Sequence, residues 1–395
     1  MKILTVLTYY RPHTSGLTIY AERLARALVK RGHEVTVMTT QFDKSLPREE
    51  MMDGVHVVRV PVAFRVSKGV IAPTFGLVAT KLVWQHDVVQ LHLPQFDAPG
   101  VALRGRLFGK PAVLTYHCDL NLPSGLFNRI VNAVVHFQNS MAGFLANRIV
   151  TYTQDYAEHS PYLSRYKDKL RTFLPPVELP DPGKDAITAF ASKHKIADQN
   201  PVIGMATRFA AEKGVGILLD AMPQILEKYP KAQVLYAGQY QDVFSEQDYA
   251  DRLMPRIKEY ETRGHWTFLG ILNPEEMAAF YPALDALVVP SLNATEAFGL
   301  VQIEAMLNNV PCVASALPGV RQPVLMHEMG EIAAIGSSDE LAGGLLKIFA
   351  DKDKYRCDTA ALAQTYDPDS VAEKYEKMFE ELRNEVNRDQ ETVKQ

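Results

Sequence analysis

The sequence predicts an α/β protein made of two doubly wound domains. Short apolar segments bounded by turn residues alternate with amphipathic segments of helical period along most of the chain. A proline-rich stretch at residues 174–183 separates this pattern into two similar halves. Alternating strands and helices imply parallel sheets covered by helices on both faces. We therefore expect domains at residues 1–178 and 179–365, with a terminal helix at 366–395.

The first half begins with a strand–helix–strand unit. Lys2–Thr8 is a short apolar strand, and residues 19–28 have the spacing of an amphipathic helix that ends at Gly32. Further apolar segments bounded by turn residues are the predicted strands of this domain: 34–39, 55–60, 88–92, 112–117 and 148–153. The order of these segments indicates one complete doubly wound domain.

Residues 125–146 form an unusually apolar helical segment, which we expect to be a core helix, with a membrane-facing or lipid-acceptor surface as the alternative. Residues 1–178 hold 21 Lys and Arg against 13 Asp and Glu, a net +8, whereas the remainder holds 21 against 33, a net −12. The basic half could contact anionic lipid head groups or a phosphorylated acceptor, although scattered solvated charge explains the excess equally well.

The composition limits the class of protein. Hydrophobic residues make up 47% of the chain and charged residues 22%, as in soluble globular proteins, and no apolar run approaches the roughly 20 residues of a membrane span. The start, MKILTVLTYY, is typical of a strand and not of a signal peptide. Three scattered cysteines, at 118, 312 and 357, fit a reducing cytoplasm. We expect a cytoplasmic protein without metal or other cofactor and without a nucleic-acid partner, and peripheral contact with the inner face of the membrane stays open.

The second half repeats the alternation. Its predicted strands are 202–206, 234–237, 267–270, 287–289 and 311–314. Its predicted helices are 185–195, 217–226, 274–283 and 338–349, with another that begins near Phe298. The terminal helix begins at Asp367 or Asp369 and has one apolar face. Because these two aspartates lie at a helix start, we interpret them as capping groups and not as metal ligands.

The residues most suited to chemistry lie in two loops of the second half. Arg208 and Lys213 follow strand 202–206, and Glu296 and Glu304 flank a helix start with seven residues between them. These carboxylates could be about 12 Å apart at most along a helix axis. A helix N-terminus suits a phosphate, and carboxylates accept hydrogen bonds from sugar hydroxyls, so a sugar nucleotide would fit. Solvated acids at a helix start are the simpler explanation for either carboxylate alone.

These motifs, in this order, resemble those of retaining glycosyltransferase family 4. The segment EAFGLVQIE resembles the family's E-x7-E signature, and residues 207–214 resemble its GR-x4-KG element, with Thr207 in place of the usual Gly. The resemblance covers nearly the whole chain. It implies the GT-B fold, in which two Rossmann-like domains face each other across a cleft. The first domain would take the acceptor, the second the nucleotide-sugar donor, and the terminal helix would pack back on the first.

The resemblance also implies roles for the charged residues. Arg208 and Lys213 would hold the donor diphosphate and offset its growing negative charge. Glu296 would bind hydroxyl groups of the donor sugar, and Glu304 the ribose of the nucleotide. No carboxylate is clearly placed for a covalent double displacement, so we favour attack by the acceptor on the face that the leaving group occupies.

Backbone and imidazole groups complete the set of residues that the resemblance implies. Amides at Phe298, Gly299 and Leu300 would meet phosphate or sugar. The turn at Gly16, where Ser15 replaces a usual Gly, would admit the donor diphosphate or the acceptor. His117, at the end of a predicted strand, would orient the donor sugar more than transfer a proton; Asp119 beside it could bind the acceptor or cap a turn.

The function that we expect is transfer of a sugar from a UDP- or GDP-linked donor to a glycan or lipid-linked acceptor. Two alternatives stay open: a sugar-nucleotide epimerase and a non-catalytic nucleotide-sugar-binding protein. A nicotinamide oxidoreductase is disfavoured because the first turn, around Gly16, lacks a GxGxxG fingerprint.

Overall fold

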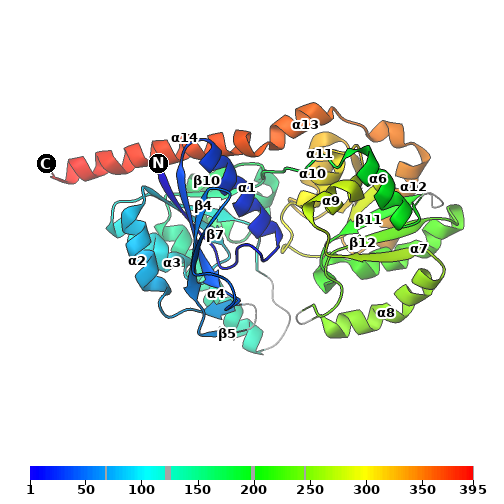
Figure 1. The fold of residues 1–395 in the computed structure, drawn as a ribbon, viewed down its shortest axis with the longest axis horizontal. Helices are drawn as coiled ribbons and strands as arrows, with labels where there is room; N and C mark the ends of the chain where they lie inside the picture. The colour runs from blue at the N-terminus through cyan, green and yellow to red at the C-terminus, as the bar shows by residue number, and fades with distance from the viewer. Residues whose placement is uncertain (67–68, 121–125, 197–200, 244–245, 395) are drawn as a thin grey trace. The chain divides into compact units, whose positions relative to one another are not determined.

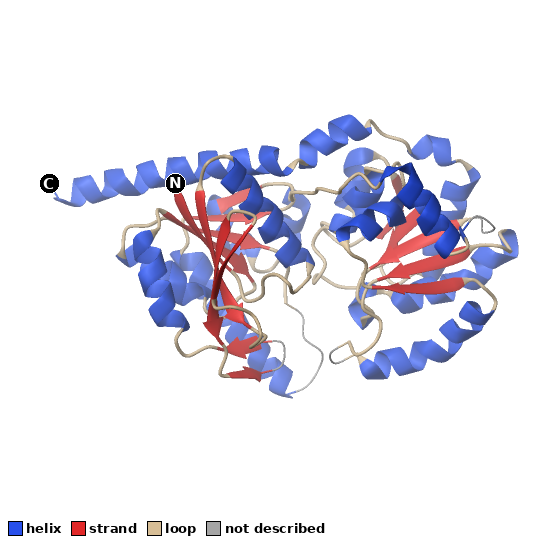
Figure 2. Ribbon diagram, viewed as in Figure 1, coloured by secondary structure: helices blue, strands red, loops and turns tan. Residues whose placement is uncertain are grey.

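The computed structural model describes residues 1–66, 69–120, 126–196, 201–243 and 246–394. The side chains of residues 66, 126–128 and 392–394 lie outside this description. The chain divides into two compact units, each with its own sheet (Figures 1 and 2). Unit 1 comprises Met1–Val177 and Thr365–Gln395, and unit 2 comprises Glu178–Gln364. The domain limits that we expected differ from these limits by one residue at each boundary.

Unit 1 is built on an eight-stranded sheet with the order β10-β9-β8-β7-β1-β2-β4-β3. Its strands are β1 (Lys2–Val6), β2 (Glu34–Gln41), β3 (Glu49–Met52), β4 (Val55–Pro61), β7 (Val88–Leu93), β8 (Ala112–Tyr116), β9 (Arg148–Thr151) and β10 (Leu170–Thr172). All neighbours pair in parallel except β3, which runs antiparallel to β4 at the edge. A separate hairpin joins β5 (Phe64–Val66) and β6 (Gly69–Ile71). Every residue of β7 is buried, as expected for a central strand covered on both faces.

The helices of unit 1 cover both faces of this sheet. Helix α1 (Gly16–Lys30) connects β1 to β2, and the terminal helix α14 (Pro368–Lys394) packs along it. The connections that contain α2 (Phe75–Gln85), α3 (Ala98–Leu107) and α4 (Leu126–Leu145) step along the sheet in the opposite direction. Because parallel crossovers are right-handed, these three helices lie on the face opposite to α1. The short elements of this unit are α5 (Gln154–His159) and η1 (Leu163–Lys169), and α13 (Thr359–Tyr366) spans the boundary with unit 2.

Helix α4 differs from the expected core helix. Its large apolar side chains include a set that is exposed to between 38% and 64%: Ile130, Val134, Phe137, Met141 and Phe144. The core interpretation is therefore wrong for these positions, because only the opposite side of α4 packs on the unit, where Ala142 is buried. Residue 125 of the predicted segment lies outside the described residues. No helix in the described ranges combines the length and the hydrophobicity that a membrane span requires.

Unit 2 is built on a six-stranded parallel sheet with the order β13-β12-β11-β14-β15-β16. Its strands are β11 (Val202–Ala206), β12 (Gln233–Ala237), β13 (Trp266–Gly270), β14 (Ala286–Val289), β15 (Cys312–Ser315) and β16 (Gly330–Ala333). One face carries α7 (Val215–Lys228), α8 (Gln247–Thr262) and α12 (Ser338–Ala350). The other carries α6 (Gly183–Lys193), α9 (Pro274–Phe280), α10 (Leu300–Met306) and α11 (Gln322–His327). Single 3-10 turns, η3 (Ala211–Lys213), η4 (Tyr281–Ala283) and η5 (Lys352–Tyr355), connect these elements.

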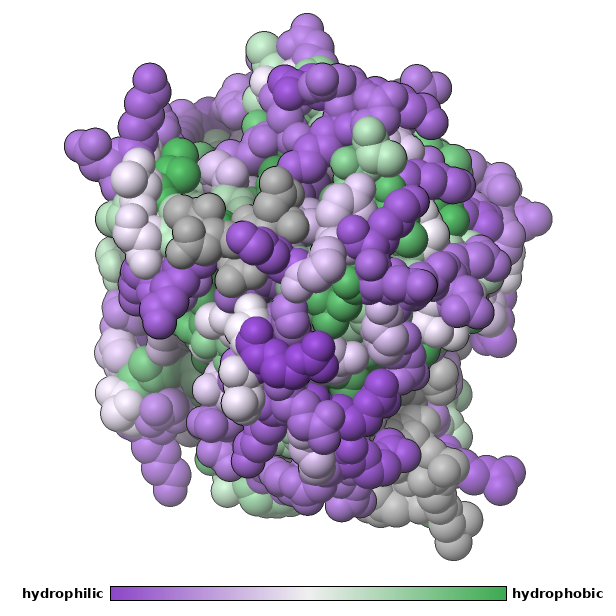
Figure 3. All heavy atoms as spheres, turned by 90° about the vertical axis from the view of Figure 1, so that its right-hand side faces the viewer, coloured by the Kyte–Doolittle hydropathy of each residue, from purple (hydrophilic) through white to green (hydrophobic). Residues whose placement is uncertain are grey.

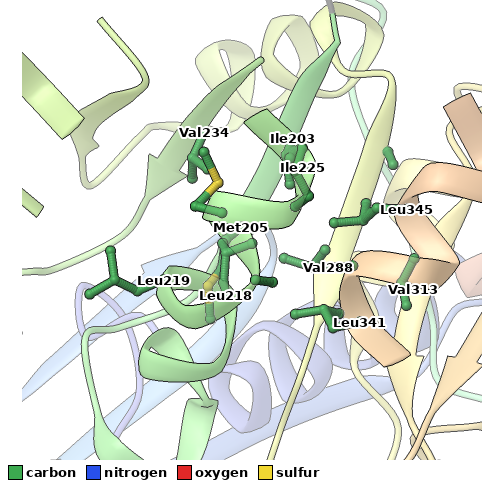
Figure 4. Packing of buried hydrophobic residues seen from close by; sticks show 14 of the residues in the cluster. Ile203, Met205, Leu218, Leu219, Ile225, Val234, Val288, Val313, Leu341 and Leu345 are labelled. Carbon is green, nitrogen blue, oxygen red and sulfur yellow. The ribbon is translucent and has the colours of Figure 1, made fainter. Parts of the chain in front are cut away.

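The core of unit 2 lies between its sheet and two of its helices. Figure 4 shows apolar side chains of β11, β12, β14 and β15 packed against those of α7 and α12. Residues on both faces of these strands are buried, as expected for a parallel sheet that is covered by helices on both sides. The surface of unit 2 seen in Figure 3 is mostly hydrophilic, with hydrophobic residues in small separate patches.

Candidate functional site

The order in which the chain adds strands to the sheet of unit 2 reverses between the neighbouring strands β11 and β14. The chain after β11 continues through α7 to β12 on one side, and the chain after β14 continues through α10 to β15 on the other. Strands β11 and β14 pair in parallel, so their carboxyl ends open side by side. In open α/β sheets, ligands bind in the crevice at this switch point. The two loops that sequence analysis singled out are the two loops at this point.

An ion pair joins the two loops. The ammonium group of Lys213 lies 2.6 Å from Oε2 of Glu296 and donates a hydrogen bond to it. The exposed fraction is 15% for the Lys213 side chain and 23% for that of Glu296, so the pair is partly shielded from water. The structure therefore brings a predicted phosphate-binding cation and a predicted sugar-binding acid together.

Backbone packing holds these loops against each other. Gly214 begins α7 with a φ angle of 74°, and a Cβ at this position would overlap the carbonyl oxygen of Pro290. In addition, the Leu292 amide donates to the Glu212 carbonyl oxygen at 2.9 Å. Only glycine can adopt this conformation at this closeness without strain. The position of Lys213 therefore depends on its neighbouring glycine.

Arg208 has a partner of its own. Its guanidinium forms an ion pair with the carboxylate of Glu212, four residues further on. The Arg208 side chain is 39% exposed, whereas that of Glu212 is 15% exposed. An anion that binds Arg208 must therefore compete with, or share the guanidinium with, Glu212.

The loop between β14 and α10 is shaped by a buried glutamine. Gln302 donates from Nε2 to the Phe298 carbonyl oxygen at 2.7 Å and to that of Val320 at 2.9 Å. Gly299 has a φ angle of 80°, and a Cβ there would lie 2.8 Å from Nε2 of Gln302. Phe298 is itself buried, and Leu300 is the first residue of α10. Gln302 thus fixes the backbone that comes directly after Glu296.

Glu304 lies in the second turn of α10 and is only 6% exposed. The hydroxyl group of Tyr281, from η4, donates to its Oε2 at 2.6 Å. A buried carboxylate requires such donors, because burial without them costs several kcal/mol, roughly 2–7 even for a neutral polar group. The hydrogen bond from Tyr281 therefore fixes the orientation of Glu304. The sequence patterns did not indicate Tyr281.

His117 follows β8 in unit 1 and is 6% exposed. Its Nε2 lies 2.8 Å from Nδ1 of His92, and its Nδ1 is hydrogen-bonded to the hydroxyl of Tyr152. The ring of Tyr20 packs edge-on against it, with 5.1 Å between ring centroids. Both ring nitrogens thus have protein partners, so His117 is held in one orientation.

Burial determines the charge of this histidine pair. Desolvation lowers the pKa of His117 well below its ordinary value of 6.5, and the neighbouring His92 lowers it further. Desolvation also lowers the pKa of His92 to about 3. Both imidazoles are therefore neutral at neutral pH, which fits an orienting role for His117 better than that of a protonated acid.

The turn after β1 is open at the predicted glycine. Ser15 caps α1, since its Oγ accepts from the Thr18 amide at 3.2 Å. A Cβ at Gly16 would meet no atom within 4 Å. The protein itself therefore does not require glycine at this position, and any such requirement must come from a ligand.

Asp119 is hydrogen-bonded to three hydroxyl groups of unit 1. Its carboxylate accepts from the hydroxyl groups of Tyr116 at 2.8 Å, Ser160 at 2.9 Å and Tyr156 at 3.0 Å. It is 9% exposed. Three neutral donors compensate its burial and connect β8 to α5.

The sequence patterns did not indicate the partners of the predicted residues: Glu212, Gln302, Tyr281, His92 and Tyr152. Two of these partners could have been identified from their positions in the sequence. Glu212 lies four residues after Arg208, the spacing of an ion pair on a helical turn. His92 is the last residue but one of β7, and His117 directly follows the neighbouring parallel strand β8. Among the described residues, no group of three or more His, Cys, Asp or Glu side chains is arranged to hold a metal ion.

Two doubly wound units, one with paired charges at its switch point, define an α/β protein of the nucleotide-binding kind. A glycosyl transferases group 1 family model matches residues 187–365, and a glycosyl transferase 4-like domain model matches residues 15–172. The chain therefore belongs to the family 4 type of glycosyltransferases, and it is an enzyme of this class with the GT-B fold. The family type and the fold inferred from the sequence are confirmed.

Individual relatives are similar to this chain over nearly the full length of both proteins. An uncharacterized glycosyltransferase of Methanocaldococcus jannaschii is 26% identical over 372 residues, covering 89% of this chain and 90% of that protein. The phosphatidyl-myo-inositol mannosyltransferase of Mycobacterium tuberculosis is 24% identical over 395 residues, covering 96% of this chain and 97% of that protein. The crystal structure of Anabaena HepE in complex with UDP and glucose has a TM-score of 0.77 and 20% identity, covering 96% of this chain and 100% of that one.

Proposed function

We propose that the chain is a retaining, metal-independent glycosyltransferase that moves a sugar from a UDP- or GDP-linked donor to a glycan or lipid-linked acceptor. The ion pair between Lys213 and Glu296 at the switch point of unit 2 carries this proposal. It places a cation for the diphosphate beside an acid for the sugar hydroxyls, as a sugar nucleotide requires. HepE, whose crystal structure contains UDP and glucose, supports the choice of ligand class.

The chemistry of the pair suits simultaneous contact with both parts of a donor. A lysine ammonium group has three hydrogen-bond donors, and the contact with Oε2 of Glu296 uses one of them. The remaining donors can contact phosphate oxygens. Carboxylate Oε1 of Glu296 is then available to accept from a sugar hydroxyl. Lys213 would thereby stabilise the negative charge that grows on the diphosphate as it leaves.

The other predicted residues complete the proposed donor site. Arg208 would contact the second phosphate through the guanidinium N–H groups that do not bind Glu212. Glu304, held by Tyr281, would accept from the ribose hydroxyls. These roles require hydrogen bonds in addition to those of the protein, which carboxylates can form because each oxygen accepts more than one.

Backbone amides and unit 1 supply the remaining contacts of the proposal. Amides at Phe298, Gly299 and Leu300 would meet phosphate or sugar, and Gly16 would leave room for the diphosphate or the acceptor. His117 would orient the transferred sugar. Since both of its ring nitrogens have partners, a sugar hydroxyl would have to replace one of them.

We propose that transfer proceeds with retention, by attack on the same face from which the diphosphate leaves. The bond between the anomeric carbon and the phosphate oxygen breaks, and a bond from this carbon to the acceptor oxygen forms. The acceptor proton passes to the departing phosphate oxygen. The groups of this chain bind, orient and compensate charge, and neutral His117 takes no proton in this scheme.

Sugar transfer from a panel of radiolabelled sugar nucleotides tests the proposal, after thermal shift selects the donors that bind. We expect Lys213→Ala to lower transfer by about 10²–10³-fold, the effect of removing one preorganised charge-stabilising donor. Lys228→Ala, on the exposed side of α7, is the matched control and should retain activity. Full transfer by Lys213→Ala would overturn the proposed site.

The same assay separates the two alternatives. An epimerase would convert the sugar of the donor without any acceptor, whereas a transferase would release the nucleotide diphosphate and elongate an acceptor. A non-catalytic binding protein would show the thermal shift but neither product. Cytoplasmic location is part of the proposal and is supported by Cys118, Cys312 and Cys357, which form no disulfide bond.

A further inference from the structure

Helices α2, α3 and α4 of unit 1 are neighbours (Figure 1), and each of them carries large apolar side chains that are exposed. We call this set the apolar face: Leu77, Trp84, Leu103, Leu107, Ile130, Val134, Phe137, Met141 and Phe144. Their exposed fractions range from 38% to 75%. Single exposed apolar residues are ordinary, but a contiguous group on packed helices indicates an interaction surface. The visible face of unit 2 has only separate apolar patches (Figure 3).

Helix α4 provides a continuous stripe of this face. Its exposed apolar residues follow one another at spacings of four, three, four and three residues, from Ile130 to Phe144. Residues at these spacings share one side of a helix. Fourteen steps at 1.5 Å give a stripe about 21 Å long. A helix of this kind lies flat on an apolar boundary and does not point into it.

The charges on these helices all have the same sign. The sequences of α2, α3 and α4 contain no Asp or Glu. Their charged residues are Lys81, Arg104, Arg106 and Arg129. Trp84 adds the residue type that prefers the boundary between lipid and water. These three helices therefore bring only cations to the apolar face, and Asp389 of α14 lines the surface hollow at one end of it, beside Trp84 and Leu107. An apolar face with an excess of cations complements a surface that is apolar inside and anionic outside.

Two cations are fixed at the end of the stripe. Arg106 donates from Nε to the Leu145 carbonyl oxygen at 3.0 Å, and its guanidinium carbon lies 5.6 Å from the centroid of the Phe144 ring. Lys169 donates to the carbonyl oxygens of Phe144 at 2.8 Å and Ala146 at 2.7 Å. The carbonyl ends of α4 thus hold positive charge beside an exposed aromatic ring.

We propose that the apolar face docks unit 1 on an anionic lipid bilayer, with α4 parallel to the membrane plane. The stripe would enter the boundary between head groups and acyl chains, and the surrounding cations would contact lipid phosphates. A second copy of the chain fits less well, because two such faces would bring like charges together. The inference needs no donor or acceptor and therefore goes beyond the proposed transfer reaction.

Co-sedimentation of the full chain with vesicles tests the inference. Vesicles of phosphatidylcholine with phosphatidylglycerol should bind the protein, and vesicles of phosphatidylcholine alone should bind it at least tenfold less. Raising the salt concentration should weaken the binding, since the Debye length falls from about 10 Å at 0.1 M to about 3 Å at 1 M. Equal binding to both kinds of vesicle, or to neither, would overturn the inference.

Matched variants assign the binding to this face. Ile130→Ser with Phe137→Ser should abolish most binding, whereas Ile271→Ser with Leu325→Ser, at similarly exposed positions of unit 2, should not. All four positions are exposed, so melting temperatures should stay unchanged and confirm folding. Equal loss in both double variants would contradict the assignment.

A second pair of variants tests the cations. Lys81→Gln with Arg129→Gln should weaken binding to anionic vesicles by about fivefold per charge. The control is Lys228→Gln with Lys258→Gln, on exposed positions of unit 2, which should bind as the unaltered chain does. Sedimentation velocity without vesicles tests whether a second copy of the chain covers the apolar face instead. A dimer that the Ile130→Ser, Phe137→Ser variant dissociates would show that the face is a protein interface and would overturn the proposal.

Discussion

Each cation of the loop after β11 has an acidic partner, and the two pairs differ in kind. Lys213 pairs with Glu296 across two loops, whereas Arg208 pairs with Glu212 within its own loop. The first pair joins two predicted ligand-binding groups. In the second pair, Arg208 is a predicted ligand-binding residue, whereas Glu212 has no proposed role. Glu212 therefore competes with the ligand for Arg208.

We predict that Glu212→Gln leaves the donor affinity unchanged or raises it by up to about fivefold. The ligand no longer has to displace a carboxylate from Arg208, whose side chain is 39% exposed, and ion pairs at exposed side chains are worth about 1 kcal/mol or less. Isothermal titration with UDP measures the effect. Arg208→Gln is the comparison and should weaken binding; equal weakening in both variants would instead make Glu212 a positioning residue for Arg208.

The buried His92–His117 pair predicts how stability depends on pH. Both pKa values are lowered in the folded chain, so below pH 6.5 the unfolded chain binds more protons than the folded one. Stability should therefore fall as the pH falls from about 6.5, by up to about 1.4 kcal/mol per pH unit for each histidine. Melting temperatures measured between pH 7 and pH 5 should decrease, and less steeply in His92→Gln. An identical slope in that variant would contradict the prediction.

At the scale of elements, the two predicted ligand-binding turns place opposite demands on glycine. Gly214 has a positive φ and touches the Pro290 carbonyl, whereas a side chain at Gly16 would meet nothing within 4 Å. Glycine at 214 is therefore required by the fold of unit 2. Glycine at 16 is not required by the fold of unit 1.

We predict that Gly16→Ala keeps the melting temperature and lowers sugar transfer by between about tenfold and 10²-fold. The added methyl group has room in the protein, so only a closely approaching ligand would be displaced, and displacements of about 1 Å have effects of this size. Transfer assays and thermal melting measure the two quantities. Unaltered transfer would show that no ligand approaches this turn closely.

Gly214→Ala should give the opposite result. The left-handed conformation alone costs about 1–2 kcal/mol for a residue with a Cβ, and the clash with Pro290 adds to this. We expect the melting temperature of unit 2 to decrease, together with donor affinity, because Lys213 precedes the strained position. Calorimetry with and without UDP measures both effects; an unchanged melting temperature would contradict the close contact.

The strands that sequence patterns predicted are apolar ones, and they include every interior strand of both sheets. Patterns missed β3, β10 and β16, which lie at sheet edges, and the separate hairpin of β5 and β6. Burial on both faces makes central strands nearly continuous apolar segments, which edge strands need not be. Exposure of the stripe on α4 could not be predicted either, since an apolar side of a helix looks the same whether it meets a core or a lipid.

At the scale of the whole molecule, the order of motifs predicted that the loops after β11 and β14 lie together. It did not predict the residues that hold these loops in place. Lys213 and Glu296 lie 83 positions apart and meet because β11 and β14 are neighbours in the sheet. Charged residues at two strand ends were sufficient to suggest this. The residues that hold them, such as Gln302 and Tyr281, act through tertiary hydrogen bonds that have no fixed spacing in the sequence.

Among the contacts of the terminal helix α14 with the core of unit 1 is a buried hydroxyl group, that of Tyr375. The hydroxyl of Tyr375 lies 2.8 Å from that of Tyr20 and 3.1 Å from Oγ1 of Thr115, and all three residues are buried. Tyr20 in turn packs on His117. Residues from both ends of the chain therefore support the orientation of a predicted site residue.

We predict that Tyr375→Phe lowers the stability of unit 1 by about 1–3 kcal/mol, because it removes a hydrogen-bond partner from two buried hydroxyl groups. Calorimetry should show a lower melting temperature for unit 1. Titration with UDP should show unchanged affinity, since the proposed donor residues belong to unit 2. The control is Tyr240→Phe, which removes a hydroxyl that makes no hydrogen bond with any described residue and should leave both quantities unchanged. Equal melting of Tyr375→Phe and the unaltered chain would show that this hydroxyl adds nothing to the other contacts of α14, which include buried Phe379 and Leu382 and the ion pair of Glu376 with Arg31.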